Sequence, residues 1–382
     1  MNSFSISTYN SGHYLLRIPI GGLGLLLLLG TLGCGGCRSS EEPAQRPGLE
    51  RLHFSTFHFC GIGTDRRVWC AGGNQDGQLG DRTYQERHSL VQVYGLEEIT
   101  GLAIGLFNTS CAWNEAGDLF CWGSNERYAI AQEDLRRIHQ ARPVTSLPPV
   151  KDVALGAYHG CALTKEQEVY CWGDNRRGQA AMGTEREVQT PTKVESLPAI
   201  QKLVSGGTHT CALDVHGTIH CWGSNDYGQL GLGSGQPLAT RPELVGLVRG
   251  RASDLSASNN HTCGLFGENR VLYCWGNNQY GQLGLDDLDP RDAPTEIAEM
   301  AYVDELATGG GQVCVRIEET VYCAGEVLRP VEVARETGEG YLFYPSQALM
   351  QTQELWGGVL AICGPVHDFS IACRGIEHRA LQ

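Results

Sequence analysis

The sequence predicts an all-β protein, specifically a seven-bladed β-propeller with about four strands in each blade. The composition is the first observation, because 50 glycines and only 4 methionines among 382 residues favour many tight turns between short elements. The second is a segment of about 50 residues that recurs seven times. The third is a pair of cysteines in every copy, placed on what reads as the two arms of a hairpin. Strand-rich repeats of this length indicate a propeller rather than a helical solenoid.

The cysteine spacing defines the repeat. Fourteen of the 16 cysteines form pairs separated by nine to eleven residues, and the first members recur at intervals of 49 to 52 residues. The seven pairs are Cys60 with Cys70, Cys111 with Cys121, Cys161 with Cys171, Cys211 with Cys221, Cys263 with Cys274, Cys314 with Cys323, and Cys363 with Cys373.

One unit, HTCALDVHGTIHCWG, shows why each pair predicts a disulfide. If Cys211 and Cys221 face each other, the turn contains Gly217, and Leu213 lies opposite Ile219 on the same face. Opposed strand residues have Cα atoms about 4.5 to 5.5 Å apart, a separation that a disulfide spans. We therefore expect one intrablade disulfide per blade, each worth at most about 3 kcal/mol in the chain-entropy model. The alternative is metal binding, but the ten-residue gap lacks a neighbouring Cys-x-x-Cys or clustered histidines, so no metal is expected.

The N-terminus indicates export. Residues 1–33 combine a single charge, Arg17, with a leucine-rich stretch and then small residues, the layout of a signal peptide. The Gly-Cys step at Cys34 resembles the lipobox of bacterial lipoproteins, and Cys37 is a second candidate for lipidation. An uncleaved signal anchor and a Cys34–Cys37 disulfide are the alternatives. Residues 34–48 are expected to form a polar tether and residues 49–382 the propeller.

The charge limits the classes of partner. The formal net charge is −14, and no run of lysine or arginine interrupts it. A surface of this sign repels phosphate backbones and anionic lipid. We therefore expect no nucleic acid, and contact with a membrane only through an N-terminal lipid or signal anchor.

A string that follows the second cysteine of five units resembles a known repeat. It reads CAGGNQDGQLGD (70–81), CWGSNERYAI (121–130), CWGDNRRGQA (171–180), CWGSNDYGQLGLG (221–233) and CWGNNQYGQLGL (274–285). These strings are similar to the regulator-of-chromosome-condensation repeat, a resemblance that implies a seven-bladed propeller over residues 49–382. The sixth unit, CAGEVLRPVEV, and the seventh, CRGIEHRALQ, lack the Gly-Gln-Leu-Gly turn. Ring closure is expected to involve residues 42–48.

Two sets of repeated residues invite a ligand hypothesis. His58, His159, His209 and His261 each stand two places before the first cysteine of a unit, and Trp122, Trp172, Trp222 and Trp275 each follow the second cysteine. A metal ring and an aromatic cage are conceivable, but satisfied packing between blades is the favoured interpretation for both sets. The acidic run 286–292 lacks the glycine and the distal glutamate of a calcium loop, which favours a hydrated turn.

The two positions after the motif asparagine change from unit to unit while the surrounding string stays constant. They supply the candidate partner-binding residues Arg127, Arg176, Arg177, Tyr227 and Tyr280. Arginine and tyrosine are common at interface hot spots, and positions that recur once per blade should ring one face. Drift of exposed turns is the alternative interpretation.

The sequence favours a non-enzymatic propeller, anchored to the bacterial envelope or secreted, that binds a protein or a glycan through one face. The first alternative is an enzyme with a pocket at the central channel, although neither a Gly-x-Ser-x-Gly elbow nor a His-Glu-x-x-His motif occurs and no cofactor is expected. The resemblance also implies a guanine-nucleotide exchange factor, the role of the founding nuclear member. Export argues against that role, because small GTPases are cytoplasmic or nuclear.

Overall fold

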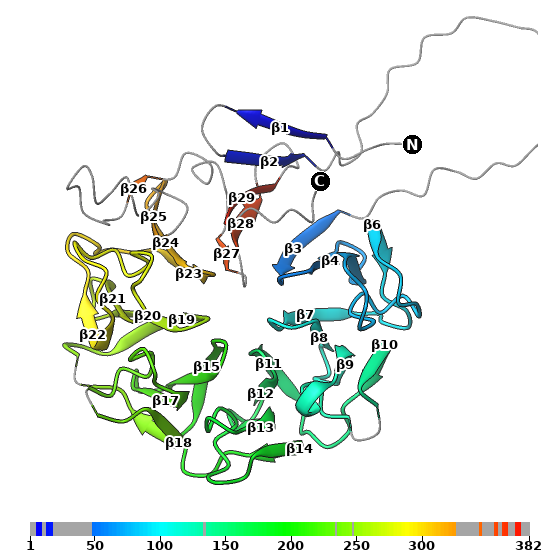
Figure 1. Cartoon of the computed structure of the whole chain (residues 1–382), viewed down its shortest axis with the longest axis horizontal. Coiled ribbons are helices and arrows are strands. Elements are labelled where there is room, and N and C mark those ends of the chain that lie inside the picture. The colour runs from blue at the N-terminus through cyan, green and yellow to red at the C-terminus, as the bar shows by residue number, and fades with distance from the viewer. Residues whose placement is uncertain are drawn as a thin grey trace, which may run out of the picture.

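Antiparallel sheets arranged around a central axis make up the fold (Figure 1). The computed structural model describes residues 5–9, 13–17, 48–132, 135–233, 235–246, 248–325, 344–345, 355–357, 361–365 and 371–375. Within this part, six sheets have four strands each, and we call them blades 1 to 6 in chain order. The first strand of each blade lies nearest the axis and the fourth lies at the rim (Figure 1).

Blade 1 contains β3 (Leu49–Phe54), β4 (His58–Gly63), β5 (Val68–Gly72) and β6 (Arg87–Gln92), and blade 2 contains β7 (Ile99–Ile104), β8 (Thr109–Asn114), β9 (Leu119–Ser124) and β10 (Arg137–Pro143). Blade 3 contains β11 (Val150–Leu155), β12 (His159–Thr164), β13 (Val169–Asp174) and β14 (Glu187–Lys193), and blade 4 contains β15 (Ile200–Ser205), β16 (His209–Asp214), β17 (Ile219–Ser224) and β18 (Leu238–Leu244). Blade 5 contains β19 (Ala252–Ser258), β20 (His261–Phe266), β21 (Val271–Gly276) and β22 (Arg291–Glu296), and blade 6 contains β23 (Glu305–Gly309), β24 (Gln312–Ile317), β25 (Thr320–Gly325) and β26 (Tyr344–Pro345).

The central hairpin of each blade has the predicted register. In blade 4, Cys211 lies opposite Cys221 and Leu213 opposite Ile219. Gly217, with φ +81°, occupies the turn, and the Asp214 carboxylate accepts a backbone hydrogen bond of 2.8 Å from Thr218. All six blades contain the expected intrablade disulfide, with Cα atoms 4.0 or 4.1 Å apart. The twelve cysteines of these six disulfides are fully buried, so the disulfides are structural.

The core lies between neighbouring blades. The four repeated tryptophans are fully buried. Each indole Nε1 donates to a carbonyl in the motif turn of the preceding blade, for example Trp222 to Gln179 O at 3.0 Å and Trp275 to Gln229 O at 2.9 Å. The interpretation of these tryptophans as core is confirmed, and their N–H groups also determine which loop lies against them.

The expectation of seven four-stranded blades is wrong, because the described residues form six such blades. The seventh unit supplies β27 (Trp356–Gly357), β28 (Ala361–Pro365) and β29 (Ile371–Gly375), which join β1 (Ser5–Tyr9) and β2 (His13–Arg17) in a five-stranded sheet of order β1-β2-β29-β28-β27. Its sequence lacks the Gly-Gln-Leu-Gly turn, which occurs in units 1, 4 and 5 and is absent from unit 6 as well. The backbone register places Cys363 opposite Cys373, but their side chains lie outside the described part.

Closure of the last sheet also differs from the expectation for residues 42–48. The edge of β29 pairs with β2, where Leu15 lies opposite Ala372 and Leu16 opposite Ile371. Pairing satisfies backbone groups that an open sheet edge would leave without partners. Residues 18–47, including Cys34 and Cys37, lie outside the described part, so the signal peptide, the tether and lipidation stay predictions.

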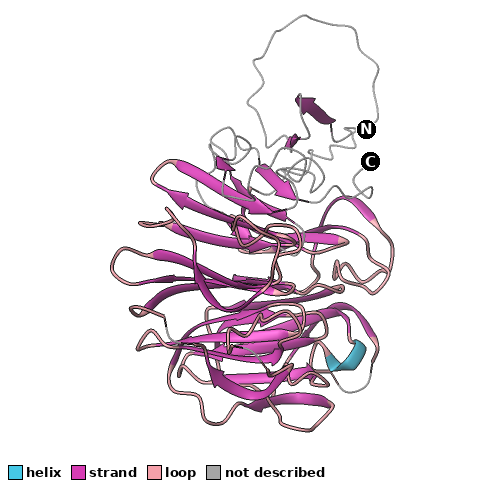
Figure 2. Ribbon diagram, turned by 60° about the vertical axis from the view of Figure 1, so that its left-hand side comes forward, coloured by secondary structure: helices cyan, strands magenta, loops and turns pink. Residues whose placement is uncertain are grey.

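Strands account for nearly all regular structure in the described part (Figure 2). The exception is a single 3₁₀ turn, η1 (Glu126–Tyr128), in blade 2. Among the described residues, no helix has the length and apolar character needed to cross a membrane.

Candidate partner-binding surface

Two sets of loops meet on one face of the ring. In blades 1 to 5, the loop between the first and second strands contacts the end of the third strand or the loop that follows it, as in the hydrogen bonds from Asp174 N to Tyr158 O (2.8 Å) and from Ser224 N to Thr208 O (2.9 Å). We call this side the motif face. The turns between second and third strands lie on the opposite face with the linkers between blades, as the bond from Ala252 N to Gly217 O (2.9 Å) shows.

The motif turn is held by its two amide side chains. The motif asparagine accepts, through Oδ1, the backbone N–H five residues later at 2.9 to 3.1 Å in blades 1 to 5. The motif glutamine accepts, through Oε1, the N–H of the second variable position, at 2.9 Å for Tyr227 and 3.0 Å for Tyr280. Because backbone bonds fix the turn, the variable side chains are free to project from it.

Glycine follows the second variable position because the turn touches the next blade. A Cβ at Gly228, where φ is +82°, would lie 2.5 Å from both Arg291 O and Asp292 Cα. In blade 2 this place is taken by Tyr128, with φ +64°, directly after Arg127 with φ +58°. Two consecutive non-glycine residues in the left-handed region cost of order 1 kcal/mol each, so blade 2 carries local strain that the other motif turns avoid.

All three arginine candidates are paired; Arg176 and Arg177 are exposed, and Arg127 is half-buried. Arg127 Nη1 lies 3.3 Å from Glu187 Oε1, and Arg177 Nη1 lies 3.4 Å from Asp226, so both reach the following blade. Arg176 binds Asp174 of its own blade through Nε at 2.7 Å and Nη2 at 2.8 Å. Burial opposes ionisation of Asp174, but the hydrogen bonds from Arg176 hold the pKa of that carboxyl below its usual value. Arg176 is thereby tied to the fold more firmly than the other two.

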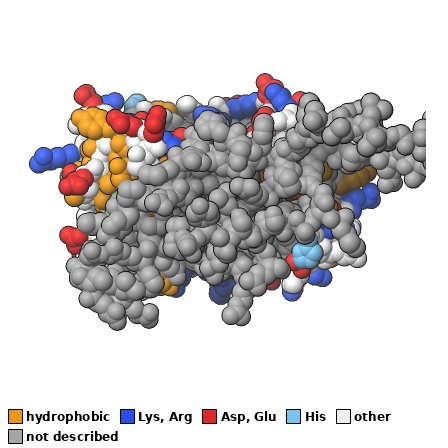
Figure 3. All heavy atoms as spheres, turned by 90° about the horizontal axis from the view of Figure 1, so that it is seen from above, with side chains coloured by type: hydrophobic (Ala, Val, Ile, Leu, Met, Phe, Trp, Pro, Cys, Tyr) orange, Lys and Arg blue, Asp and Glu red, His pale blue; other side chains and the backbone are white. Residues whose placement is uncertain are grey.

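The two tyrosine candidates have no such partner. The residues Tyr227 and Tyr280 are 37% and 42% exposed. Neither phenol hydroxyl bonds to another residue in the described part of the chain, so the rings present amphipathic surface to solvent. In the view of Figure 3, basic and acidic side chains lie interspersed over the described surface.

The structure adds aromatic residues that the sequence analysis missed. Phe107 stacks on Tyr158 of the next blade with ring centroids 5.0 Å apart, and the Arg127 guanidinium lies 5.7 Å from the Tyr158 centroid. Both rings belong to loops between the first and second strands of a blade, outside the repeated string that follows the second cysteine. The sequence signal for these rings is an aromatic residue one or two places before the repeated histidine position, as Tyr158 stands before His159.

The four repeated histidines form links between blades on this side of the core. His159 Nε2 lies 2.9 Å from Thr210 Oγ1, which lies 3.2 Å from Gln179 O. Because a carbonyl only accepts, the hydroxyl donates to it and accepts from Nε2, so Nε2 carries a proton. The same relation holds for His58 with Ser110 and His209 with Thr262, while His261 Nε2 donates to Gln312 O at 3.3 Å.

Burial controls the protonation of these histidines. It lowers the pKa of His58 and His209 to about 3 and that of His159 and His261 to about 4. Each ring is at most 4% exposed, and each Nδ1 lacks a hydrogen-bond partner. These residues therefore pack between blades as expected, but the expectation that their polar atoms are satisfied holds only for Nε2 and is wrong for Nδ1.

The central channel is narrow on the motif face. A cavity of about 120 Å³ lies among the ends of the innermost strands, with Phe54, Leu106 and Leu155 on the side of blades 1 to 3 and Ser205, Ser258 and Thr308 on the side of blades 4 to 6. None of the described residues that line it carries a carboxylate, a lysine or a cysteine. The polar side chains of its lining are three hydroxyl groups, the amide of Asn259 and the imidazole of His53.

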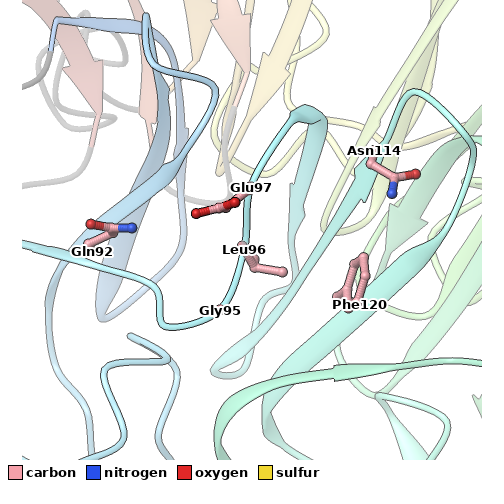
Figure 4. Close-up of a pocket in the computed structure, with 6 residues that line it drawn as sticks. All are labelled: Gln92, Gly95, Leu96, Glu97, Asn114 and Phe120. Atoms are coloured by element: carbon pink, nitrogen blue, oxygen red, sulfur yellow. The ribbon is translucent and has the colours of Figure 1, made fainter.

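A pocket of about 270 Å³ lies on the opposite face, at the linker between blades 1 and 2. Figure 4 shows Leu96 of the linker and Phe120 of β9 on neighbouring sides of it. Glu97 is its one ionisable residue and pairs with Arg67 at 3.3 Å. Asn114 uses its amide in the hairpin turn of its own blade, so the pocket contains no uncommitted charged group.

Comparison with known proteins identifies the family. A model of the RCC1-like domain matches residues 30–326. The chain belongs to the RCC1-like domain family. Among curated relatives, the X-linked retinitis pigmentosa GTPase regulator is 32% identical over 132 residues in Canis lupus familiaris and 33% identical over 129 residues in Mus musculus. Each match covers 32% of this chain and only 13% of the relative.

Solved structures of RCC1-like propellers share the fold at low identity. Prp20p of Saccharomyces cerevisiae superposes with a TM-score of 0.69 at 17% identity, covering 89% of this chain and 85% of that protein. Human WBSCR16 gives a TM-score of 0.70 at 18% identity, covering 86% and 87%. At this identity the likeness establishes the architecture alone.

Proposed function

We propose that the protein is a non-enzymatic propeller that binds a protein partner through its motif face. The observation that carries this proposal is the motif turn. An asparagine bond holds its backbone in blades 1 to 5 and a glutamine bond adds to it in blades 1, 3, 4 and 5. The second variable position meanwhile changes from arginine in blades 2 and 3 to exposed tyrosine in blades 4 and 5. A rigid scaffold with variable arginine and tyrosine side chains is the arrangement of a specific interface.

Two further observations support the proposal. Prp20p, which shares the fold, binds Gsp1p and histones, so this architecture supports protein recognition. The channel, in contrast, does not favour the enzyme alternative, because its described lining includes no carboxylate to act with His53. The buried interblade histidines have lowered pKa values and face packed side chains, so they are not placed to exchange protons with a substrate.

Site-specific cross-linking in the native cell tests the interface. A photo-reactive amino acid at position 227 or 280 should give a discrete adduct with one protein. The same group at position 215 is the control, since Val215 is 41% exposed in a turn on the opposite face. Adducts that are absent at both motif-face positions, or equally abundant at 215, would contradict the proposal.

We further propose that the protein is exported and anchored by a lipid at Cys34 or Cys37. Lipidation at either cysteine follows removal of the preceding residues, so on this proposal the pairing of β2 with β29 belongs to the uncleaved chain. Six buried disulfides support the export, because such bonds persist in oxidising compartments. Palmitate labelling should mark the wild type and be lost in Cys34→Ala or in Cys37→Ala. An unlabelled wild type would refute the lipid anchor and leave secretion.

A further inference from the structure

A groove on the motif face separates the motif turn of blade 4 from blade 5. Its volume is about 620 Å³, and its lining includes Tyr227, Pro237 and Pro290 together with Asp226 and Asp292. The backbone makes the groove rigid, because Gly233 N donates to Asp292 O at 2.8 Å on one side. On the other side, Gly228 packs against the backbone of Asp292.

At the two preceding blade boundaries, the position of Tyr227 in the motif turn is occupied by an arginine that forms an ion pair with the next blade. At the boundary between blades 2 and 3, Arg127 pairs with Glu187, and between blades 3 and 4, Arg177 pairs with Asp226. Both arginines occupy the second variable position of the motif turn. Each boundary therefore joins a guanidinium from one blade to a carboxylate of the next.

The boundary between blades 4 and 5 has neither member of this pair, since Pro290 and Gln279 take the places of Glu187 and Asp226, and the groove presents a different carboxylate, Asp292. The second variable position is Tyr227, and the exposed Asp292 of β22 pairs with no cation in the described part of the chain. The adjacent Arg291 is engaged elsewhere, with Nη2 2.6 Å from Asp287 and Nη1 bonded to Asp289 O at 2.8 Å. An open groove beside an aromatic ring takes the place of that ion pair.

We propose that this groove receives an arginine or lysine side chain of the partner protein, which pairs with the exposed Asp292 carboxylate beside Tyr227. The inference rests on the proposed binding function of the motif face. Asp292 pairs with the incoming charge, and the Tyr227 ring offers a cation–π contact to its stem or head group. The two prolines border the site with rigid apolar surface suited to the methylene groups.

The interaction can be measured on the full-length protein with a fluorescent hexa-arginine peptide as the probe and a hexa-glutamate peptide as its counterpart. We expect hexa-arginine to bind and hexa-glutamate not to bind at low ionic strength. Asp292→Asn and Tyr227→Ala should each weaken binding of hexa-arginine by about threefold to tenfold. Tyr227→Arg should weaken it at least as much, because the new guanidinium can pair with Asp292 as Arg127 does with Glu187.

Glu166→Gln is the matched control, since it removes one exposed carboxylate from the turn between β12 and β13 on the opposite face. It should leave the affinity unchanged. Equal losses in Glu166→Gln and Asp292→Asn would show attraction by net charge alone and overturn the inference, as would unchanged binding in all three groove variants. Circular dichroism melts establish that the variants fold, and the isosteric Asp292→Asn change at an exposed side chain decides the matter if Tyr227→Ala does not.

The outcome separates this inference from the proposed function. A partner cross-linked from position 280, together with unchanged peptide binding in the groove variants, removes the cation site and keeps the motif-face interface. Absence of adducts from both 227 and 280 removes the interface itself.

Discussion

Acidification from pH 7 to pH 5 should destabilise the propeller through its interblade histidines. Their folded-state pKa values of about 3 to 4 lie below the ordinary histidine pKa of 6.5. Between these limits the unfolded chain binds protons that the folded chain does not, so stability is fully present above about pH 6.5 and falls as pH decreases toward the folded values.

The size of the effect at pH 5 depends mainly on the unfolded state. Protonating an unfolded imidazole at 1.5 pH units below a pKa of about 6.5 lowers its free energy by about 2 kcal/mol, while the folded ring stays neutral. Four such histidines together amount to at most about 8 kcal/mol. Carboxyl groups with lowered pKa values, such as Asp174 and Asp214, change the pH dependence of stability only near and below the ordinary aspartate pKa of 3.8, which lies outside this window.

Denaturant unfolding under oxidising conditions at pH 7 and at pH 5 measures this difference. The informative variant is His209→Gln, because blade 6 carries Gln312 at the equivalent position. The variant is less stable at pH 7, but the difference between the two pH values should shrink by about 2 kcal/mol. His88→Gln is the control, since that side chain is 83% exposed. A pH difference that is the same in His209→Gln as in the wild type would refute the reasoning.

Two further predictions concern stability. The double change Cys211→Ser with Cys221→Ser should lower the free energy of unfolding by up to about 3 kcal/mol, measured as the denaturation midpoint against reduced and oxidised wild type; an unchanged midpoint would mean that the hairpin alone restricts the unfolded chain. Gly228→Ala should destabilise more than Gly233→Ala. Both glycines have φ near +82° or +81°, but an added Cβ meets backbone at 2.5 Å in the first and nothing within 4 Å in the second, so equal melting temperatures would contradict the packing described.

Local features of the fold followed from the sequence. The register of the central hairpin, the pairing of its cysteines and the glycine of its turn involve residues separated by about ten positions. Short separation leaves few alternative pairings, and repetition of the same string restricts them further. The variable positions of the motif turn were found in the same way, because one unit could be compared with the next.

The tertiary structure decided what lies between units. The stack of Phe107 on Tyr158 and the bond from His209 to Thr262 join residues about 50 positions apart, and nothing in one repeat specifies how closely the next one packs. The number of blades and the pairing of β2 with β29 depend on the backbone groups left open at the last sheet edge. The groove at Asp292 is lined by residues of blades 4 and 5, and only the assembled ring brings Tyr227 and Asp292 to the same place.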